Sequence, residues 1–157
     1  MGQVHRSAQV IRAALVLLIL ILAGCTFKTK LVGPYDDIVD ININQLQSET
    51  SAHLTTIVSH RGEGEGAYDR LKPFYPATSG KLDALIVRAE VLESGLKKTP
   101  LVDNLVLLKA QYRALETLHQ TPFNEKVMAS AAQALAMSYR AIVKHLVFLK
   151  WNQEQPQ

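Results

Sequence analysis

From residue 35 onward, apolar residues recur every three or four positions, the spacing that places side chains on one face of an α-helix. The first such stretch predicts a helix from about Tyr35 to His60. Its buried stripe is expected to contain Val39, Ile43, Leu46, Thr50, Leu54 and Ile57. Carboxylates at Asp36, Asp37 and Asp40 oppose the positive end of the helix dipole. We therefore assign them to stabilisation of the helix start rather than to a metal site.

Alternating glycines then interrupt the helical pattern at Gly62, Gly64 and Gly66. Each glycine costs about 1 kcal/mol relative to alanine inside a helix, so the sequence predicts a flexible loop. Glycine-rich loops can bind phosphate by directing backbone N–H groups at the anion. Because Glu63 and Glu65 would repel an anion, we do not assign a phosphate site here.

A second helix is expected to begin within residues 67–72 and to be disturbed by Pro73 and Pro76. Each proline removes a backbone donor and clashes with the preceding turn, so a kink or a restart is predicted. The regular part of this helix carries an apolar stripe and stops at Gly95. The stripe comprises Leu82, Leu85, Ile86, Ala89 and Leu92.

Two Thr-Pro pairs mark the starts of the remaining helices, at Thr99-Pro100 and Thr121-Pro122. Threonine is a favoured N-cap acceptor, and proline suits the first helical position. The third helix is predicted at about residues 101–119 and the fourth at about 123–151. The stripe of the fourth helix is expected to comprise Val127, Ala131, Ala134, Leu135, Ile142, Leu146 and Leu149. Four helices with short connections predict an all-α, antiparallel up-down bundle.

The segment before these helices has the parts of an export signal: a polar start with Arg6 and Arg12, an apolar core at residues 13–22, and small residues after it. The apolar core is about half of the roughly 20 residues that a membrane-spanning helix needs. A cleaved signal peptide is therefore preferred to the alternative, an uncleaved anchor.

The apolar core ends in Leu22-Ala23-Gly24-Cys25, which resembles a bacterial lipobox. The resemblance implies a diacylglycerol on Cys25, cleavage between Gly24 and Cys25, and acylation of the new N-terminus. Thr26 stands where the enterobacterial sorting rule reads Asp as retention, so the resemblance implies the outer membrane, facing the periplasm. The expected organisation is a signal peptide at 1–24, a lipidated tether at 25–34, a helical bundle at 35–151 and a frayed tail at 152–157.

Charge and cysteine content narrow the expected partners. Without Arg6 and Arg12, which the predicted cleavage removes, the formal charge falls from +3 to +1, so no basic footprint for nucleic acid is expected. Cys25 is the only cysteine, and its acylation leaves no thiol for a disulfide, a nucleophile or a metal site. The membrane, through the lipid on Cys25, and a protein of the envelope are the expected partners.

The histidines that remain after the predicted cleavage are His53, His60, His119 and His145. Residues seven apart, such as His53 and His60, are separated by about 10 Å along a helix axis, too far to bind one metal ion alone. We therefore expect surface or helix-end histidines, no metal site and no cofactor. A nucleophile-elbow motif is absent from the sequence, and no catalytic residues are assigned, so an enzyme is not expected.

Aromatic side chains near the expected helix ends and kinks suggest one further surface. Tyr68, Phe74, Tyr75 and Trp151 are candidates for a docking surface, since aromatic residues often anchor interfaces. Packing in the core or between helices is nevertheless the preferred interpretation of these four residues.

Several of these positions also resemble small helical lipoproteins of proteobacteria. The resemblance is carried by Tyr35-Asp36, Asp40, Gln47, Thr50, Tyr68, Phe74-Tyr75, Leu82, Leu85 and Arg88-Ala89-Glu90. It implies a helical fold and an envelope address, and it transfers no activity. We therefore expect a lipid-anchored structural or protein-binding module of the cell envelope. The alternative is a carrier of a small ligand or metal that faces the periplasm.

Overall fold

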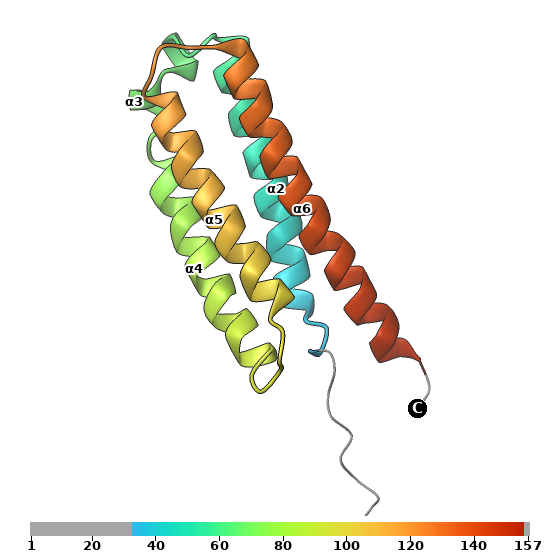
Figure 1. The fold of residues 1–157 in the computed structure, drawn as a ribbon. Helices are drawn as coiled ribbons and strands as arrows, with labels where there is room; N and C mark the ends of the chain where they lie inside the picture. Colours follow the sequence, from blue (N-terminus) through green and yellow to red (C-terminus); the bar gives the residue numbers. More distant parts are fainter. Residues whose placement is uncertain (1–32, 156–157) are drawn as a thin grey trace, which may run out of the picture. The chain divides into compact units, whose positions relative to one another are not determined.

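The described part of the chain, residues 33–155 of a computed structural model, is an all-α bundle without strands. Its long helices are α2 (Asp37–Ser59), α4 (Phe74–Leu92), α5 (Pro100–His119) and α6 (Glu125–Glu154). They run alternately up and down, as Figure 1 shows, which confirms the predicted antiparallel bundle. The predicted signal peptide, the lipidation site and most of the tether lie outside the described residues.

Asp36 caps the start of α2 and also ties that start to a neighbouring helix. Its carboxylate accepts a hydrogen bond of 2.9 Å from the backbone N–H of Val39. The guanidinium group of Arg88 in α4 reaches the same carboxylate through two nitrogens, at 2.7 to 3.0 Å. This two-nitrogen contact is the strong form of an arginine–carboxylate pair, and it lowers the pKa of Asp36.

The connection from α2 to α4 follows the glycine and proline signals. Arg61 and Gly62 adopt left-handed backbone angles, with φ of 50° and 74°, and so reverse the chain after α2. Two short elements follow, the 3₁₀ turn η1 (Gly64–Gly66) and α3 (Tyr68–Leu71). The helix then restarts at Phe74, directly after Pro73, as the missing proline donor predicts.

The start of α5 is capped by a residue that the sequence analysis did not assign. The side chain of Thr99 makes no capping hydrogen bond, so that part of the prediction is wrong. The carboxylate of Glu93, from the end of α4, accepts hydrogen bonds from the backbone N–H groups of Leu101 at 3.0 Å and Val102 at 3.1 Å. Glu93 is therefore buried and structural.

The start of α6 also differs from the prediction. The helix begins at Glu125 because the side chain of Asn124 accepts a hydrogen bond of 3.2 Å from the backbone N–H of Val127. Thr121-Pro122 belongs to the preceding loop instead. At its other end α6 continues to Glu154, which extends helix into the tail predicted at 152–157.

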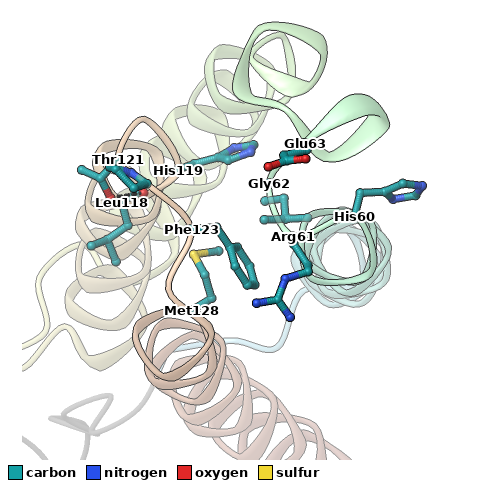
Figure 2. Close-up of a pocket in the computed structure, with 11 residues that line it drawn as sticks. His60, Arg61, Gly62, Glu63, Leu118, His119, Thr121, Phe123 and Met128 are labelled. Carbon is teal, nitrogen blue, oxygen red and sulfur yellow. Dashed lines mark hydrogen bonds between the residues drawn. The ribbon is translucent and has the colours of Figure 1, made fainter.

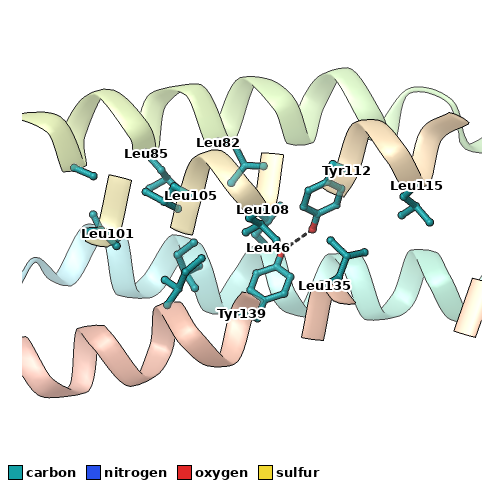
Figure 3. Packing of buried hydrophobic residues seen from close by; sticks show 14 of the residues in the cluster. Leu46, Leu82, Leu85, Leu101, Leu105, Leu108, Tyr112, Leu115, Leu135 and Tyr139 are labelled. Carbon is teal, nitrogen blue, oxygen red and sulfur yellow. Dashed lines mark hydrogen bonds between the residues drawn. The ribbon is translucent and has the colours of Figure 1, made fainter. Parts of the chain in front are cut away.

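Leucine is the most frequent residue of the core, part of which is shown in Figure 3. Buried leucines are Leu46, Leu82, Leu85, Leu101, Leu105, Leu108, Leu115, Leu135 and Leu146. The predicted stripes agree with this core except at Leu54, Ile86 and Leu92, which are only partly buried against it, and at the start of α6, where Met128 is buried and Val127 is exposed. Ala131 and Ala134 pack only partly, so the buried face is shifted by one residue in the first turns of α6.

Candidate functional site

A pocket of about 620 Å³ opens at one end of the bundle, where α2, the glycine loop and the α5–α6 connection meet (Figure 2). The guanidinium carbon of Arg61 lies 5.6 Å from the centre of the Phe123 ring, within the range of a cation–π contact. Leu118 and Met128 supply apolar walls, and Figure 2 shows His60 pointing away from the pocket. The pocket is therefore lined by both apolar and charged side chains.

A continuous line of hydrogen bonds lies directly beside this pocket and links two histidines through one tyrosine. The hydroxyl of Tyr75 lies 3.2 Å from Nε2 of His53 and 2.6 Å from Nδ1 of His119. Nε2 of His119 lies 2.8 Å from the carbonyl oxygen of Gly66. All three side chains are buried, and they come from α2, α4 and α5.

The carbonyl oxygen of Gly66 fixes one end of this line, because it can only accept. Nε2 of His119 therefore carries a proton and donates it to this carbonyl. The Tyr75 hydroxyl lies between the other nitrogen of His119 and Nε2 of His53, and it can donate to one of them and accept from the other. Burial raises the pKa of the Tyr75 hydroxyl, which keeps its proton in place.

His53 is held in its neutral form by this environment. Burial, and secondarily the nearby ring of His119, lower the pKa of His53 to about 4. The ring stacks on Phe74 with centroids 3.8 Å apart and an interplanar angle of 14°. The histidines were predicted to lie on surfaces or at helix ends. This holds for the exposed His60 and for His119, which is buried but is the last residue of α5, and it is wrong for His53, which is buried in the middle of α2.

Three of the four aromatic residues predicted as a docking surface come together at this end of the bundle. Tyr75 is buried, while Tyr68 and Phe74 are partly buried against the core. The rings of Tyr68 and Tyr75 are 6.1 Å apart, and the Tyr68 hydroxyl donates to Glu116 at 3.1 Å. The fourth residue, Trp151, is exposed in the last turns of α6, and Figure 1 shows that α6 ends at the opposite end of the bundle from α3. The four side chains therefore do not form one surface.

A second cluster of polar side chains lies inside the bundle. The hydroxyls of Thr50, Tyr112 and Tyr139, from α2, α5 and α6, contact one another, with 2.5 Å between the two tyrosine oxygens (Figure 3). Thr50 also donates to the carbonyl of Leu46 at 2.6 Å. Burial raises the pKa of both tyrosine hydroxyls, so the group stays neutral and joins three helices.

An apolar groove of about 630 Å³ runs between α2 and α4, and we call it the α2–α4 groove. Its lining combines apolar side chains with polar and charged ones: Ile38, Ala84, Leu85, Val87, Val91 and Leu92, together with Asn42, Asp36, Lys81 and Arg88. Val87 is 60% exposed and Val91 is 71% exposed. Two ion pairs bridge the same two helices, Asp36 with Arg88 and Glu49 with Lys81. The groove therefore presents apolar side chains to solvent between charged groups that pair with each other.

Metal and membrane features can be stated for residues 33–155. No three His, Cys, Asp or Glu side chains within that range converge so as to hold a metal ion. None of the helices in the same range has the length and apolar character of a membrane span. Cys25, the predicted lipidation site, and Gly24, the predicted cleavage position, lie outside it.

No protein-family model matches the chain, and neither a curated protein nor a solved structure matches it. Function must therefore be inferred from the residues themselves.

Proposed function

We propose that this chain is a lipoprotein of the bacterial envelope, anchored through Cys25, whose bundle binds an apolar helix of a partner protein in the α2–α4 groove. The anchor is supported by the sequence Leu22-Ala23-Gly24-Cys25, and the proposed address is the periplasmic face of the outer membrane. The binding role is supported above all by the exposed valines of the groove.

The apolar side chains of the groove favour an amphipathic helix as its occupant. Contiguous exposed apolar side chains mark interaction sites, and an amphipathic helix buries its apolar face by lying between two others. Ile38 approaches the groove from α2, and Val87 and Val91 approach it from α4. Because the ion pairs of Asp36 and Glu49 are already formed across the two helices, the partner needs no opposite charge at those positions.

The anchor is tested by metabolic labelling with a clickable fatty acid. The wild-type chain should take up label, and Cys25→Ala should lose it and remain as precursor, since no other thiol exists. Label retained by Cys25→Ala would refute the lipoprotein assignment.

The groove is tested by photo-crosslinking in cells, with the photoreactive residue at Val87 or, as a matched control, at Val106. Both side chains are exposed valines of long helices, but Val106 lies on α5, away from the groove. We expect one discrete adduct from Val87 that Val91→Asp removes, and none from Val106. Equal adducts from both positions would contradict the groove, and an adduct of twice the chain mass would assign it to a second copy.

The second candidate function, a small-ligand or metal carrier, is favoured by the pocket between Arg61 and Phe123. It is tested by calorimetric titration of the protein with zinc, copper and haem. Stoichiometric binding that His119→Ala abolishes and His145→Ala retains would place the carrier ahead of the docking module. Weak binding that is insensitive to both substitutions would contradict it.

A further inference from the structure

The last turns of α6 expose large apolar side chains that neither the core nor the α2–α4 groove uses. Trp151 is 57% exposed and Phe148 is 46% exposed, and Val147 beside them is also exposed. Residues three and four apart on a helix lie on one face, so these three side chains form a single patch. Lys144 and Lys150 are exposed in the same turns.

This patch lies at the end of the bundle from which the chain leads toward Cys25. The ammonium group of Lys150 is 5.5 Å from the centre of the Tyr35 ring, so the end of α6 lies beside the start of α2. Figure 1 shows the two helix ends at the same end of the bundle, opposite the loop that contains α3. Gly33, close to Leu96 of the α4–α5 connection, belongs to this end too.

Chain length limits how far this end can lie from the anchor. Gly33 is eight residues after Cys25, and eight extended residues span at most about 28 Å. That reach is shorter than α2, whose 23 residues measure about 35 Å. If Cys25 carries lipid, the end of the bundle with Trp151 therefore stays near the bilayer.

We propose that Val147, Phe148 and Trp151 form a membrane-contact surface that inserts into the interfacial layer of the bilayer holding the Cys25 lipid. Tryptophan is the residue most typical of that layer, because its ring is apolar and its N–H is polar. Lys144 and Lys150 can extend their ammonium groups to lipid phosphates while their stems follow the apolar side chains. This inference rests on the proposed lipid anchor.

The proposed contact with the bilayer depends on insertion of the apolar side chains rather than on net charge. Carboxylates of Asp37 and Glu154 are also exposed at this end of the bundle and offset part of the lysine charge. A surface of three apolar side chains would bind vesicles weakly by itself. The tether raises its effective concentration at the bilayer, so that weak contact is enough.

Trp151 is the only tryptophan of the chain, and its fluorescence tests the proposal directly. The mature lipidated protein is reconstituted into phosphatidylethanolamine–phosphatidylglycerol vesicles, with and without bromine on the acyl chains. We expect emission at shorter wavelength than from the same protein after the bundle is released by proteolysis of the tether, and strong quenching by the brominated lipid. Equal intensity in both kinds of vesicle would overturn the surface.

Two variants make the test specific. Replacing Val147 and Phe148 by serine should reduce quenching severalfold, while replacing Val106 and Leu107, an exposed apolar pair on α5, should leave it unchanged. Flotation of the vesicles distinguishes a failure of the proposed surface from a failure of the proposed lipid anchor. Protein that floats with unquenched Trp151 refutes only the surface, whereas protein that does not float refutes the lipid anchor and the surface that depends on it.

Discussion

The hydroxyl of Tyr75 lies 2.6 Å from Nδ1 of His119 and 3.2 Å from Nε2 of His53, so one buried hydroxyl joins two imidazole rings. Because both rings meet one hydroxyl in a buried space, a proton added to His53 has no carboxylate to pair with. Protonation of His53 in this buried site therefore lowers the stability of the bundle.

Stability is expected to fall as the pH is lowered from 6.5 to about 4. The pKa of His53 is about 4 in the folded chain and 6.5 when unfolded, so in this window the unfolded chain binds a proton that the folded chain excludes. One such proton lowers the free energy of unfolding by at most about 1.4 kcal/mol per pH unit. The lowered pKa of His145, caused by burial, acts in the same direction.

Urea unfolding at a series of pH values measures this slope. His53→Leu should flatten it, with the residual slope due to His145 and to carboxylates, whereas His60→Gln, at an exposed position, should leave it unchanged. A slope that is the same in His53→Leu and in the wild type would show that His53 titrates normally.

Capping of α5 by Glu93 predicts unequal effects of two substitutions. Glu93→Ala leaves the N–H groups of Leu101 and Val102 without their acceptor, and it should lower the free energy of unfolding by about 1 to 3 kcal/mol. Thr99→Ala removes no capping bond and should change it by less than about 0.5 kcal/mol. Chemical denaturation at neutral pH measures both, and equal losses would contradict the assignment of the cap to Glu93.

The elements that the sequence predicted well depend on local signals. Asp36 caps α2 from the position before its first residue, and the chain breaks at Gly62 and Pro73 as their backbone preferences require. The role of Glu93 could not be read in this way, because its carboxylate reaches a helix start eight residues further along the chain. Such a contact depends on how two helices pack and not on spacing within one of them.

The line of hydrogen bonds through His53, Tyr75 and His119 was not predicted for a related reason, although the spacing of His53 was informative. His53 follows Leu46 by seven residues and precedes Ile57 by four, so it shares their buried face. Its partners Tyr75 and His119 come from two other helices, and no pattern within a single helix indicates that their side chains meet. Trp151 was grouped with Tyr75 by residue type, whereas the fold places the two at opposite ends.

The three contacting hydroxyls of Thr50, Tyr112 and Tyr139 should contribute to the free energy of unfolding as one coupled group. Tyr139→Phe or Tyr112→Phe alone should lower the free energy of unfolding by about 1 kcal/mol, the usual value of one hydrogen bond. The double variant should differ from the sum of the two by at least about 0.5 kcal/mol, because the oxygens contact each other. Tyr68→Phe, whose hydroxyl bonds Glu116 outside this group, should be additive with Tyr139→Phe. Additivity in both pairs would contradict a coupled group.

Replacement by alanine should change the free energy of unfolding in opposite directions at two glycines with different surroundings. A Cβ at Gly66 would lie 2.9 Å from the carbonyl oxygen of Thr56 and from Cβ of His60, so the loop must shift and its bond to His119 must weaken. Gly66→Ala should therefore cost about 1 to 3 kcal/mol. A Cβ at Gly80, inside α4, meets nothing within 4 Å, and Gly80→Ala should stabilise the chain by about 0.5 to 1 kcal/mol. NMR measures the exchange of the Nε2–H proton of His119 with solvent. This proton should stay protected in Gly80→Ala and exchange rapidly in Gly66→Ala. Equal protection in both variants would show that the Gly66 carbonyl does not hold the His119 ring.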